Sequence, residues 1–394
     1  MLMGVNAGSG VTHARNGRSQ NAITSSVFDK CASTGLAVAL VPLAASASSE
    51  QVLYNFQGGQ DGANPVSTPI DVDGILYGTT LEGGGSCGCG TLYSVTPDGT
   101  ETVLHQFAGG SDGLEPRGGL LNVDGVLYGT TQGGGKYNNG TVYRLLRDGT
   151  EQIVHSFEGA PTDGYNPDAG LINFNGVLYG TTIGGGTSNN GTIFALAQDG
   201  TETVIHSFIA AEGKNPEAPL LEMNGILYGT TYYGGSAHDG TVFSITPAGE
   251  FQVLHSFGTP RGDGAYPSAA LINLNGVLYG TTELGGSHNW GSVYSITPAG
   301  TEAVLYSFPT TSGHPESSLL AVNGALLGTT NEQTQTDGTI YSVTTSGHGS
   351  LLFTFDGLDG ANPYAGLVRA GNMLYGATDT GGTAGLGTVY SFTH

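Results

Sequence analysis

The chain has 394 residues, of which 32 are acidic and 10 are Lys or Arg, so its formal net charge is −22 at neutral pH. Such a surface repels phosphate backbones and anionic lipid, which argues against nucleic acid and membrane partners and leaves neutral ligands and cations. No apolar run approaches the roughly 18 residues of a membrane-spanning helix, so we expect no membrane insertion.

Residues 1–47 have the composition of a secretory leader. An apolar stretch at residues 36–43 follows Lys30 and precedes Ala45-Ser46-Ala47, a pattern typical of a signal peptide cleaved after Ala47. This pattern predicts a secreted or periplasmic protein. The alternative is a polar tail followed by a hydrophobic linker.

One sequence unit repeats seven times from about residue 50 to the C-terminus. Its clearest line is Gly-x-Leu-Tyr-Gly-Thr-Thr, with the fourth position at Tyr77, Tyr128, Tyr179, Tyr228, Tyr279, Leu327 and Tyr375. A spacing of 48 to 51 residues is typical of units that each form one four-stranded sheet and bury their faces only against neighbouring units. The repeats therefore predict an all-β protein, a seven-bladed β-propeller with four antiparallel strands per blade.

Each unit contains four strand-sized runs, which we call strands A to D. Asp-Gly and Asn-Gly pairs such as Asp73-Gly74 separate A from B, and both positions of such pairs tolerate the positive φ of a tight hairpin. The blades are expected at about 62–107, 113–157, 164–208, 213–257, 264–308, 313–355 and 360–394, in a single domain over residues 48–394.

The last unit lacks its fourth strand. It ends at the C strand, residues 387–392, whereas a D-type run stands alone at residues 50–56 near the N-terminus. We therefore expect the N-terminal strand to complete the last blade and close the ring, which hides the sheet edges of an open array.

The repeated phrases Gly-x-Leu-Tyr-Gly-Thr-Thr, Gly-Thr-Val-Tyr-Ser and Val-Leu-His-Ser-Phe resemble those of the GloVer (Gloeobacter and Verrucomicrobia) tandem-repeat family. The resemblance covers about 345 residues of the chain. It implies an exported propeller and no established chemistry.

Function is expected on the face that carries the long B–C and D–A loops, because loops on a rigid scaffold commonly carry binding residues. Residues repeated in most units, including His105, His155, His206 and His255, are predicted to be packing residues without a metal role. Two positions instead vary from blade to blade. The first follows the unit's proline and reads Val66, Arg117, Asp168, Glu217, Ser268, Glu316 and Tyr364. The second follows Thr-Thr and reads Leu81, Gln132, Ile183, Tyr232, Glu283, Asn331 and Asp379.

Both variable positions should ring the mouth of the central channel and bring carboxylates together there. Like charges so close either raise each other's pKa or recruit a cation. Hard oxygen ligands in a flexible ring suit calcium better than a transition metal. The predicted calcium ligands are Asp168, Glu217, Glu316, Asn331 and Asp379.

The remaining candidate site residues concern proton transfer and substrate contact. Glu283, His288 and His314 are the candidate catalytic proton carriers, since carboxylates and imidazoles perform general acid–base catalysis. Arg117, Tyr232, Trp290 and Tyr364 are the candidate substrate-binding residues.

These features favour an exported, monomeric, calcium-dependent hydrolase that acts on a small neutral ester or lactone at the channel mouth. The expectation follows an analogy with propeller lactonases that hold calcium on their axis, which concerns the fold alone. One alternative is a non-catalytic carbohydrate- or protein-binding surface module. Another is a polysaccharide lyase or glycosidase, because paired carboxylates or a neutralising metal would serve those reactions too.

Cys87 and Cys89 are the only cysteines after the predicted leader. A Cys-x-Cys pair in a glycine-rich loop is able to form a small disulfide in an oxidising compartment or to ligate a soft metal. Bracing of the loop is the favoured role.

Overall fold

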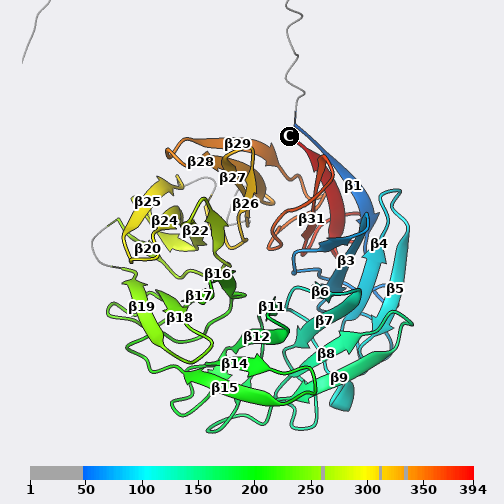
Figure 1. Cartoon of the computed structure of the whole chain (residues 1–394). Coiled ribbons are helices and arrows are strands. Elements are labelled where there is room, and N and C mark those ends of the chain that lie inside the picture. The colour runs from blue at the N-terminus through cyan, green and yellow to red at the C-terminus, as the bar shows by residue number, and fades with distance from the viewer. Residues whose placement is uncertain (1–47, 259–261, 310–312, 332–335) are drawn as a thin grey trace, which may run out of the picture. The chain divides into compact units, whose positions relative to one another are not determined.

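The computed structural model describes residues 48–258, 262–309, 313–331 and 336–394, and the predicted leader lies outside these ranges. The described residues belong to one compact unit. Seven four-stranded antiparallel sheets follow one another around a ring (Figure 1), which confirms the predicted all-β seven-bladed propeller. One short 3-10 turn, η1 (Gly110–Asp112), is the only helical element among the described residues. None of these residues lies in a helix long and apolar enough to cross a membrane.

The strands follow the chain blade by blade, from the innermost strand A to the outermost strand D. Blade 1 contains β2 (Ile70–Val72), β3 (Ile75–Thr80), β4 (Thr91–Val95) and β5 (Glu101–Gln106). Blade 2 contains β6 (Leu121–Val123), β7 (Val126–Thr131), β8 (Thr141–Leu145) and β9 (Glu151–Ser156). Blade 3 contains β11 (Ile172–Phe174), β12 (Val177–Thr182), β14 (Thr192–Leu196) and β15 (Glu202–Ser207). Blade 4 contains β16 (Leu221–Met223), β17 (Ile226–Thr231), β18 (Thr241–Ile245) and β19 (Phe251–Ser256).

The remaining blades keep the same pattern. Blade 5 contains β21 (Ile272–Leu274), β22 (Val277–Thr282), β24 (Ser292–Ile296) and β25 (Glu302–Ser307). Blade 6 contains β26 (Leu320–Val322), β27 (Ala325–Thr330), β28 (Thr339–Thr344) and β29 (Gly349–Thr354). Blade 7 contains β30 (Val368–Ala370), β31 (Met373–Thr378), β32 (Thr388–Thr393) and the N-terminal β1 (Ser49–Asn55).

The long loops of a blade also pair with each other. In blade 3, β10 (Gly164–Tyr165) of the D–A loop pairs with β13 (Gly184–Gly185) of the B–C loop, and in blade 5, β20 (Gly264–Ala265) pairs with β23 (Leu284–Gly285). This pairing, which the repeats alone did not indicate, holds the two loops together on one face of the ring.

The tight A–B hairpins have the expected backbone. Asp73 and Gly74 have φ of 54° and 84°, and Asn175 and Gly176 have φ of 55° and 81°. Positive φ at both central positions is the signature of the hairpin turns that match strand twist.

The N-terminal strand closes the ring as predicted. β1 runs antiparallel to β32, with Ser49 opposite Thr393 and Asn55 opposite Thr388. Phe56, directly after β1, is fully buried and packs edge-on against Tyr93 of blade 1, with ring centroids 5.0 Å apart. The first and last blades are thereby joined by hydrogen bonds as well as by packing.

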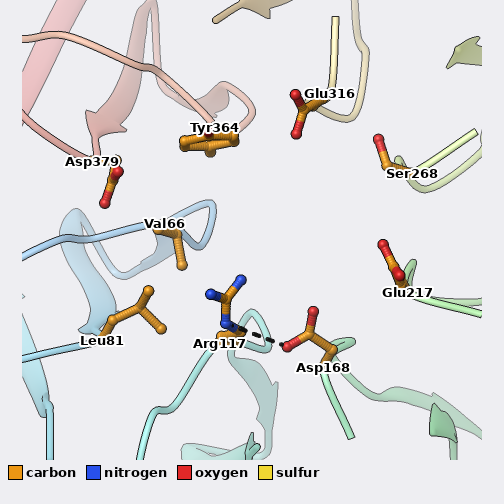
Figure 2. A pocket seen from close by; sticks show the side chains of 9 residues that line it. All are labelled: Val66, Leu81, Arg117, Asp168, Glu217, Ser268, Glu316, Tyr364 and Asp379. Atoms are coloured by element: carbon orange, nitrogen blue, oxygen red, sulfur yellow. Dashed lines mark ion pairs between the residues drawn. The ribbon is translucent and has the colours of Figure 1, made fainter. Parts of the chain in front are cut away.

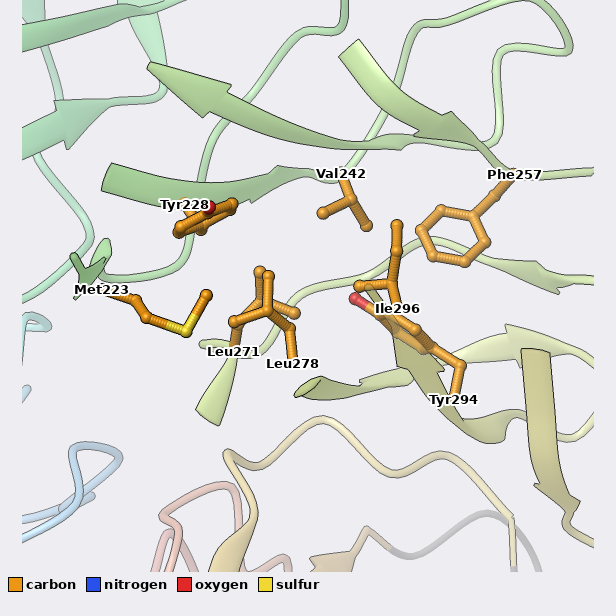
Figure 3. Packing of buried hydrophobic residues seen from close by; sticks show 8 residues of the cluster. All are labelled: Met223, Tyr228, Val242, Phe257, Leu271, Leu278, Tyr294 and Ile296. Carbon is orange, nitrogen blue, oxygen red and sulfur yellow. The ribbon is translucent and has the colours of Figure 1, made fainter. Parts of the chain in front are cut away.

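The hydrophobic core lies between adjacent blades. In Figure 3, Phe257 at the end of blade 4 faces Tyr294 of blade 5, with Leu271 and Leu278 packed beside them. The rings of Phe257 and Tyr294 are 5.0 Å apart in a T-shaped arrangement, and the equivalent aromatic pair recurs at the other junctions. Such pairs stabilise by about 0.5–1.5 kcal/mol beyond the area that they bury.

The glycine of the Tyr-Gly-Thr-Thr motif makes room for the aromatic residue of the neighbouring strand. A Cβ at Gly129 would lie 2.3 Å from the hydroxyl oxygen of Tyr143, and a Cβ at Gly180 would lie 2.5 Å from Phe194. Any larger residue would displace the ring that fills the blade junction.

Deletion of residues 50–56 should abolish cooperative folding. The deletion exposes β32 as an edge and removes Phe56, and loss of a buried Phe side chain alone costs about 3–5 kcal/mol. Urea unfolding followed by circular dichroism measures the effect.

A circular permutant provides the control. Moving residues 49–56 behind His394 through a short turn keeps the same strand pairing, because Ser49 already lies opposite Thr393. The permutant should regain most of the lost stability. Wild-type stability in the deletion variant would show that β1 does not close the ring.

Candidate functional site

The loop face of the ring opens on a central cavity of about 380 Å³. Every blade contributes one residue to this cavity, the residue directly after the proline that recurs in each repeat. These residues are Val66, Arg117, Asp168, Glu217, Ser268, Glu316 and Tyr364, joined by Leu81 and Asp379 from the second variable position (Figure 2). All seven residues of the first variable position therefore share one space with two residues of the second.

The repeated framework fixes the segment that carries each cavity residue. Thr130 in blade 2 donates a hydrogen bond of 3.0 Å to the carbonyl of Ala169, next to Asp168 of blade 3. Pro167, on the other side of Asp168, packs against Gly140, where a Cβ would lie 2.4 Å from the proline ring. The side chain between these two anchors has little freedom except to point into the cavity.

Four neighbouring blades supply an oxygen-rich arc along one side of the cavity. In chain order it consists of Asp168, Glu217, Ser268 and Glu316, and Figure 2 shows them side by side, with Asp379 on the opposite side. Among the described residues, Arg117 is the one basic side chain that lines the cavity, and its Nε lies 3.6 Å from Oδ1 of Asp168. Three carboxylates in this arc thus face a single guanidinium.

Burial and mutual repulsion make these carboxylates reluctant to ionise. Burial, with contributions from Asp168, Glu283 and Glu316, raises the pKa of Glu217 to about 8. Burial and then Glu283 raise the pKa of Glu316 to about 7. Burial raises the pKa of Asp168 to about 6 against the opposing effect of Arg117, and burial also raises the pKa of Asp379. One guanidinium therefore does not balance the acidic charge of the cavity.

Two polar side chains beside these carboxylates lack ordinary partners among the described residues. The hydroxyl oxygen of Ser268, between Glu217 and Glu316, is buried and makes no hydrogen bond there. Asn331 is only 4% exposed, and neither atom of its amide has a partner of normal hydrogen-bond geometry in the described part of the chain. Its proximity nevertheless lowers the pKa of Glu316. Buried polar atoms of this kind are usually satisfied by water or an ion.

Glu283 lies near enough to Glu217 and Glu316 of the arc to raise the pKa of both, and it contacts two aromatic side chains. The hydroxyl of Tyr232 donates a short hydrogen bond to its Oε2, and Nδ1 of His314 lies 3.7 Å from its Oε1. Tyr232 stacks on Tyr266 with ring centroids 5.2 Å apart. Burial and then Glu283 raise the pKa of Tyr232, whereas burial lowers the pKa of His314 against the pull of Glu283.

The backbone next to this network is strained. Tyr266 and His314 precede the prolines of blades 5 and 6 with φ of 59° and 65°, where blades such as blade 3 have an asparagine, Asn166. Bulky residues rarely adopt positive φ, and such strain persists mainly at functional sites.

The other predicted site residues lie further from the cavity. Trp290 packs into the core between blades 5 and 6 and meets the ring of His314 edge-on at 5.2 Å. His288 is exposed and hydrogen-bonds to the hydroxyl of Ser287 in a separate hollow formed by the loops of blades 4 and 5. The structure therefore brings Glu283 and His314 toward the predicted calcium ligands and leaves His288 apart from them.

Sequence reasoning assigned no role to Ser268 or Tyr266. Ser268 occupies the first variable position, so its place in the ring could be predicted. Its side chain is uncharged, however, and therefore gave no indication of a ligand role. Tyr266 could have been noticed as the aromatic residue that replaces asparagine before a proline.

Cys87 and Cys89 form a disulfide in the B–C loop of blade 1. Of the roles considered for the pair, loop bracing therefore fits, and metal ligation by free thiolates does not.

The fold and the site define this protein as a β-propeller with an acidic central cavity. More specifically, it belongs to the Gloeobacter/Verrucomicrobia repeat family, whose profile matches residues 39–182 and 147–335, together more than half of the chain. This match confirms the resemblance seen in the repeated phrases. No curated protein matches the sequence.

Several solved structures are similar in fold at low sequence identity. A provisional 6-phosphogluconolactonase from Bacteroides fragilis NCTC 9343 is 16% identical with a TM-score of 0.50, over 83% of this chain and 100% of its own. Another, from Bacteroides uniformis ATCC 8492, is 15% identical with a TM-score of 0.49, over 72% and 82%. A provisional gluconolactonase is 13% identical with a TM-score of 0.45, over 88% and 92%. At these identities the likeness concerns the fold alone.

The cation-free protein should lose stability as the pH rises from about 5 to about 8. The pKa of Glu217 is about 8 in the fold against an ordinary value of 4.5, so over this interval the folded state holds the proton more tightly than the unfolded state. The free energy of unfolding then falls with pH, by at most about 1.4 kcal/mol per pH unit for each fully coupled group.

Urea unfolding of the wild type and of Glu217→Gln across this pH interval, with chelator present, measures the effect. The variant should show a shallower decline. An equal decline in both proteins would mean that Glu217 does not hold its proton as described.

Replacing Thr130 by Val should loosen the segment that carries Asp168. The substitution keeps the shape of the buried side chain but leaves the carbonyl of Ala169 without its donor, which costs about 1–3 kcal/mol. Urea unfolding measures the loss, and Thr102→Val on the exposed side of β5 is the matched control. Equal stability of the two variants would contradict an anchoring role for Thr130.

Proposed function

We propose that this protein is a calcium-dependent hydrolase whose substrate is a small neutral ester or lactone bound in the central cavity. The observation that carries the proposal is the arc of Asp168, Glu217, Ser268 and Glu316, whose half-buried carboxyls have raised pKa values and whose serine hydroxyl has no partner among the described residues.

The donor set fits a hard cation. All donors in the arc are oxygens, which suits calcium, an ion that takes 6–8 oxygen ligands at about 2.3–2.6 Å in flexible geometry. Asp168, Glu217 and Glu316 would hold the ion, with the hydroxyl of Ser268 as a neutral ligand, and Asn331 behind Glu316 would orient that carboxylate. Asp379, which was also predicted as a calcium ligand, lies on the opposite side of the cavity from the arc. When bound, the ion would polarise the carbonyl group of the substrate.

The chain's own residues would bind the substrate and move the proton. The side chain of Arg117, 42% exposed, and the ring of Tyr364, 39% exposed, present a donor and an apolar face to a ligand in the cavity. Glu283, paired with His314 and Tyr232, lies close enough to Glu217 and Glu316 to shift the pKa of both. In this role Glu283 accepts the proton of the attacking water, the carbonyl carbon forms a bond to the water oxygen, and the proton passes to the leaving oxygen as the ester bond breaks.

The proposal includes export to an oxidising compartment. The Cys87–Cys89 disulfide supports it, because disulfides persist mainly in secreted and periplasmic proteins. The strongly acidic composition supports a neutral rather than a phosphorylated substrate, since like charges repel. The protein is expected to act as a monomer.

A carbohydrate-binding module is the second candidate. Tyr364 at the cavity and Tyr233 on the adjacent loop face are each 39% exposed, and exposed aromatic rings commonly stack on sugars. Binding of oligosaccharides without turnover would favour a binding module. Cleavage of polysaccharides in place of lactones would favour a lyase or glycosidase.

Glu217→Gln and Glu316→Gln should each lower ester or lactone turnover by at least about 100-fold and weaken calcium binding, because each removes a charged oxygen from the arc. Turnover of lactone and ester panels and calorimetric calcium titration measure both effects. The matched control is Glu250→Gln, which removes the same charge at an exposed turn between strands C and D of blade 4. If the wild type hydrolyses a substrate and both cavity variants retain that activity, the site is misplaced.

A further inference from the structure

A second type of polar cluster lies at the outer edge of the ring, away from the cavity. There a histidine of one D strand, an aspartate of the following D–A loop and the glutamate that opens the next D strand come together. In the part of the chain that the structure describes, the three complete sets are His105 with Asp112 and Glu151, His155 with Asp163 and Glu202, and His255 with Asp263 and Glu302. In each set one ligand atom per residue lies within 4.8 Å of the other two.

The histidine–aspartate spacing in each set is compatible with that of two ligands of one metal ion. The distances between Nε2 of the histidine and Oδ2 of the aspartate are 3.2, 3.4 and 3.0 Å in the three sets. Two donors at 2.0–2.1 Å from a tetrahedral ion stand about 3.3 Å apart, so the same spacing serves a hydrogen bond and a pair of metal ligands. The side chains of His105, His155 and His255 are 21%, 17% and 17% exposed, which leaves access for an ion and for a water ligand.

Each set also contains a carboxylate oxygen that no hydrogen bond within the described part of the chain satisfies. Oε1 of Glu151, of Glu202 and of Glu302 is buried and has no hydrogen-bond partner among the described residues. Burial and then the nearby aspartate raise the pKa of each of these glutamates to about 7. Two carboxylates that face each other with one buried free oxygen need a proton or a cation between them.

The other junctions provide built-in comparisons. At His206 the D–A loop supplies Glu212 at 3.2 Å, but Phe251 stands where the third ligand would be and stacks on the imidazole, with ring centroids 4.0 Å apart. Elsewhere the imidazole is replaced, as at Tyr54, whose hydroxyl donates to Asp61. A contact between the D strand and the carboxylate of the D–A loop therefore persists at both junctions without a complete set.

We propose that the three His-Asp-Glu sets are binding sites for divalent first-row transition ions such as Zn²⁺. Imidazole nitrogen with carboxylate oxygen is a donor combination that suits such ions, and three protein ligands leave one position for water. Because the glutamate comes from the next blade, each ion would link two neighbouring blades. The repetition of these histidines in the sequence predicted packing roles without a metal. That prediction did not take account of the carboxylates that face them, because these come from the D–A loop and the next blade.

The test uses untagged full-length protein stripped with chelator and then supplied with excess Ca²⁺ to occupy the central cavity. Calorimetric titration with Zn²⁺ should show three equivalents per chain, and Co²⁺ should give the visible absorption of a tetrahedral site. His105→Gln, His155→Gln and His255→Gln should each remove one equivalent, since Gln keeps an N–H near the aspartate but is a poor ligand. His206→Gln is the matched control and should leave three equivalents.

Thermal unfolding gives an independent readout. Zn²⁺ should raise the Tm of the wild type and leave that of the triple His→Gln variant unchanged. Should the triple variant fail to fold, the combined variant Glu151→Gln, Glu202→Gln and Glu302→Gln takes its place. Absence of Zn²⁺ binding, or a stoichiometry that both triple variants preserve, would overturn the proposal and leave the histidine–aspartate hydrogen bond as the role of each set.

Discussion

The buried threonines of the Tyr-Gly-Thr-Thr motif are the constraint on which the rest of the structure depends. In every blade the second hydroxyl meets a Thr or Ser hydroxyl of strand C at 2.7–2.9 Å. In five blades the first hydroxyl donates to a backbone carbonyl at the start of the next blade. A buried hydroxyl without a partner costs about 1–3 kcal/mol, so the ring holds together only when each blade meets its neighbour in the correct register.

This constraint also explains why the variable residues meet. The carbonyls that accept from the first threonine belong to residues such as Ala169 and Ala218, which directly follow Asp168 and Glu217. The framework thus fixes the backbone and leaves the cavity residue free to differ in each blade. The repeated residues form the same framework in all seven blades, and the chemical character of the cavity depends on the variable positions that this framework does not specify.

Much of the architecture was predictable because it is local or repeated. Hairpins follow from Asp-Gly and Asn-Gly pairs, blade number from the motif count, and ring closure from the missing D strand. The placement of the first variable position was predictable as well, because a residue directly after the repeated proline lies at the same place in every blade. Boundaries were less so. The D strand of blade 1 begins at Glu101, opposite Val95, two residues before the apolar run that starts at Val103.

The parts that escaped prediction depend on contacts between different blades. Glu283 contacts Tyr232, which is 51 residues away in the sequence. Trp290, in the same B–C loop as Glu283, packs against the core. The outer histidines meet a glutamate of the next blade, a contact that no single repeat reveals. His288 and His314 are both histidines of the loop face, and only the three-dimensional course of the loops separates one from the other.

The most direct test of the account is a crystal structure of the protein grown with Ca²⁺ and analysed by anomalous diffraction. The account predicts one calcium peak in the central cavity, within about 2.3–2.6 Å of carboxylate oxygens from Asp168, Glu217 and Glu316, with the Ser268 hydroxyl turned toward it. A cavity that contains only water at saturating Ca²⁺ would contradict it.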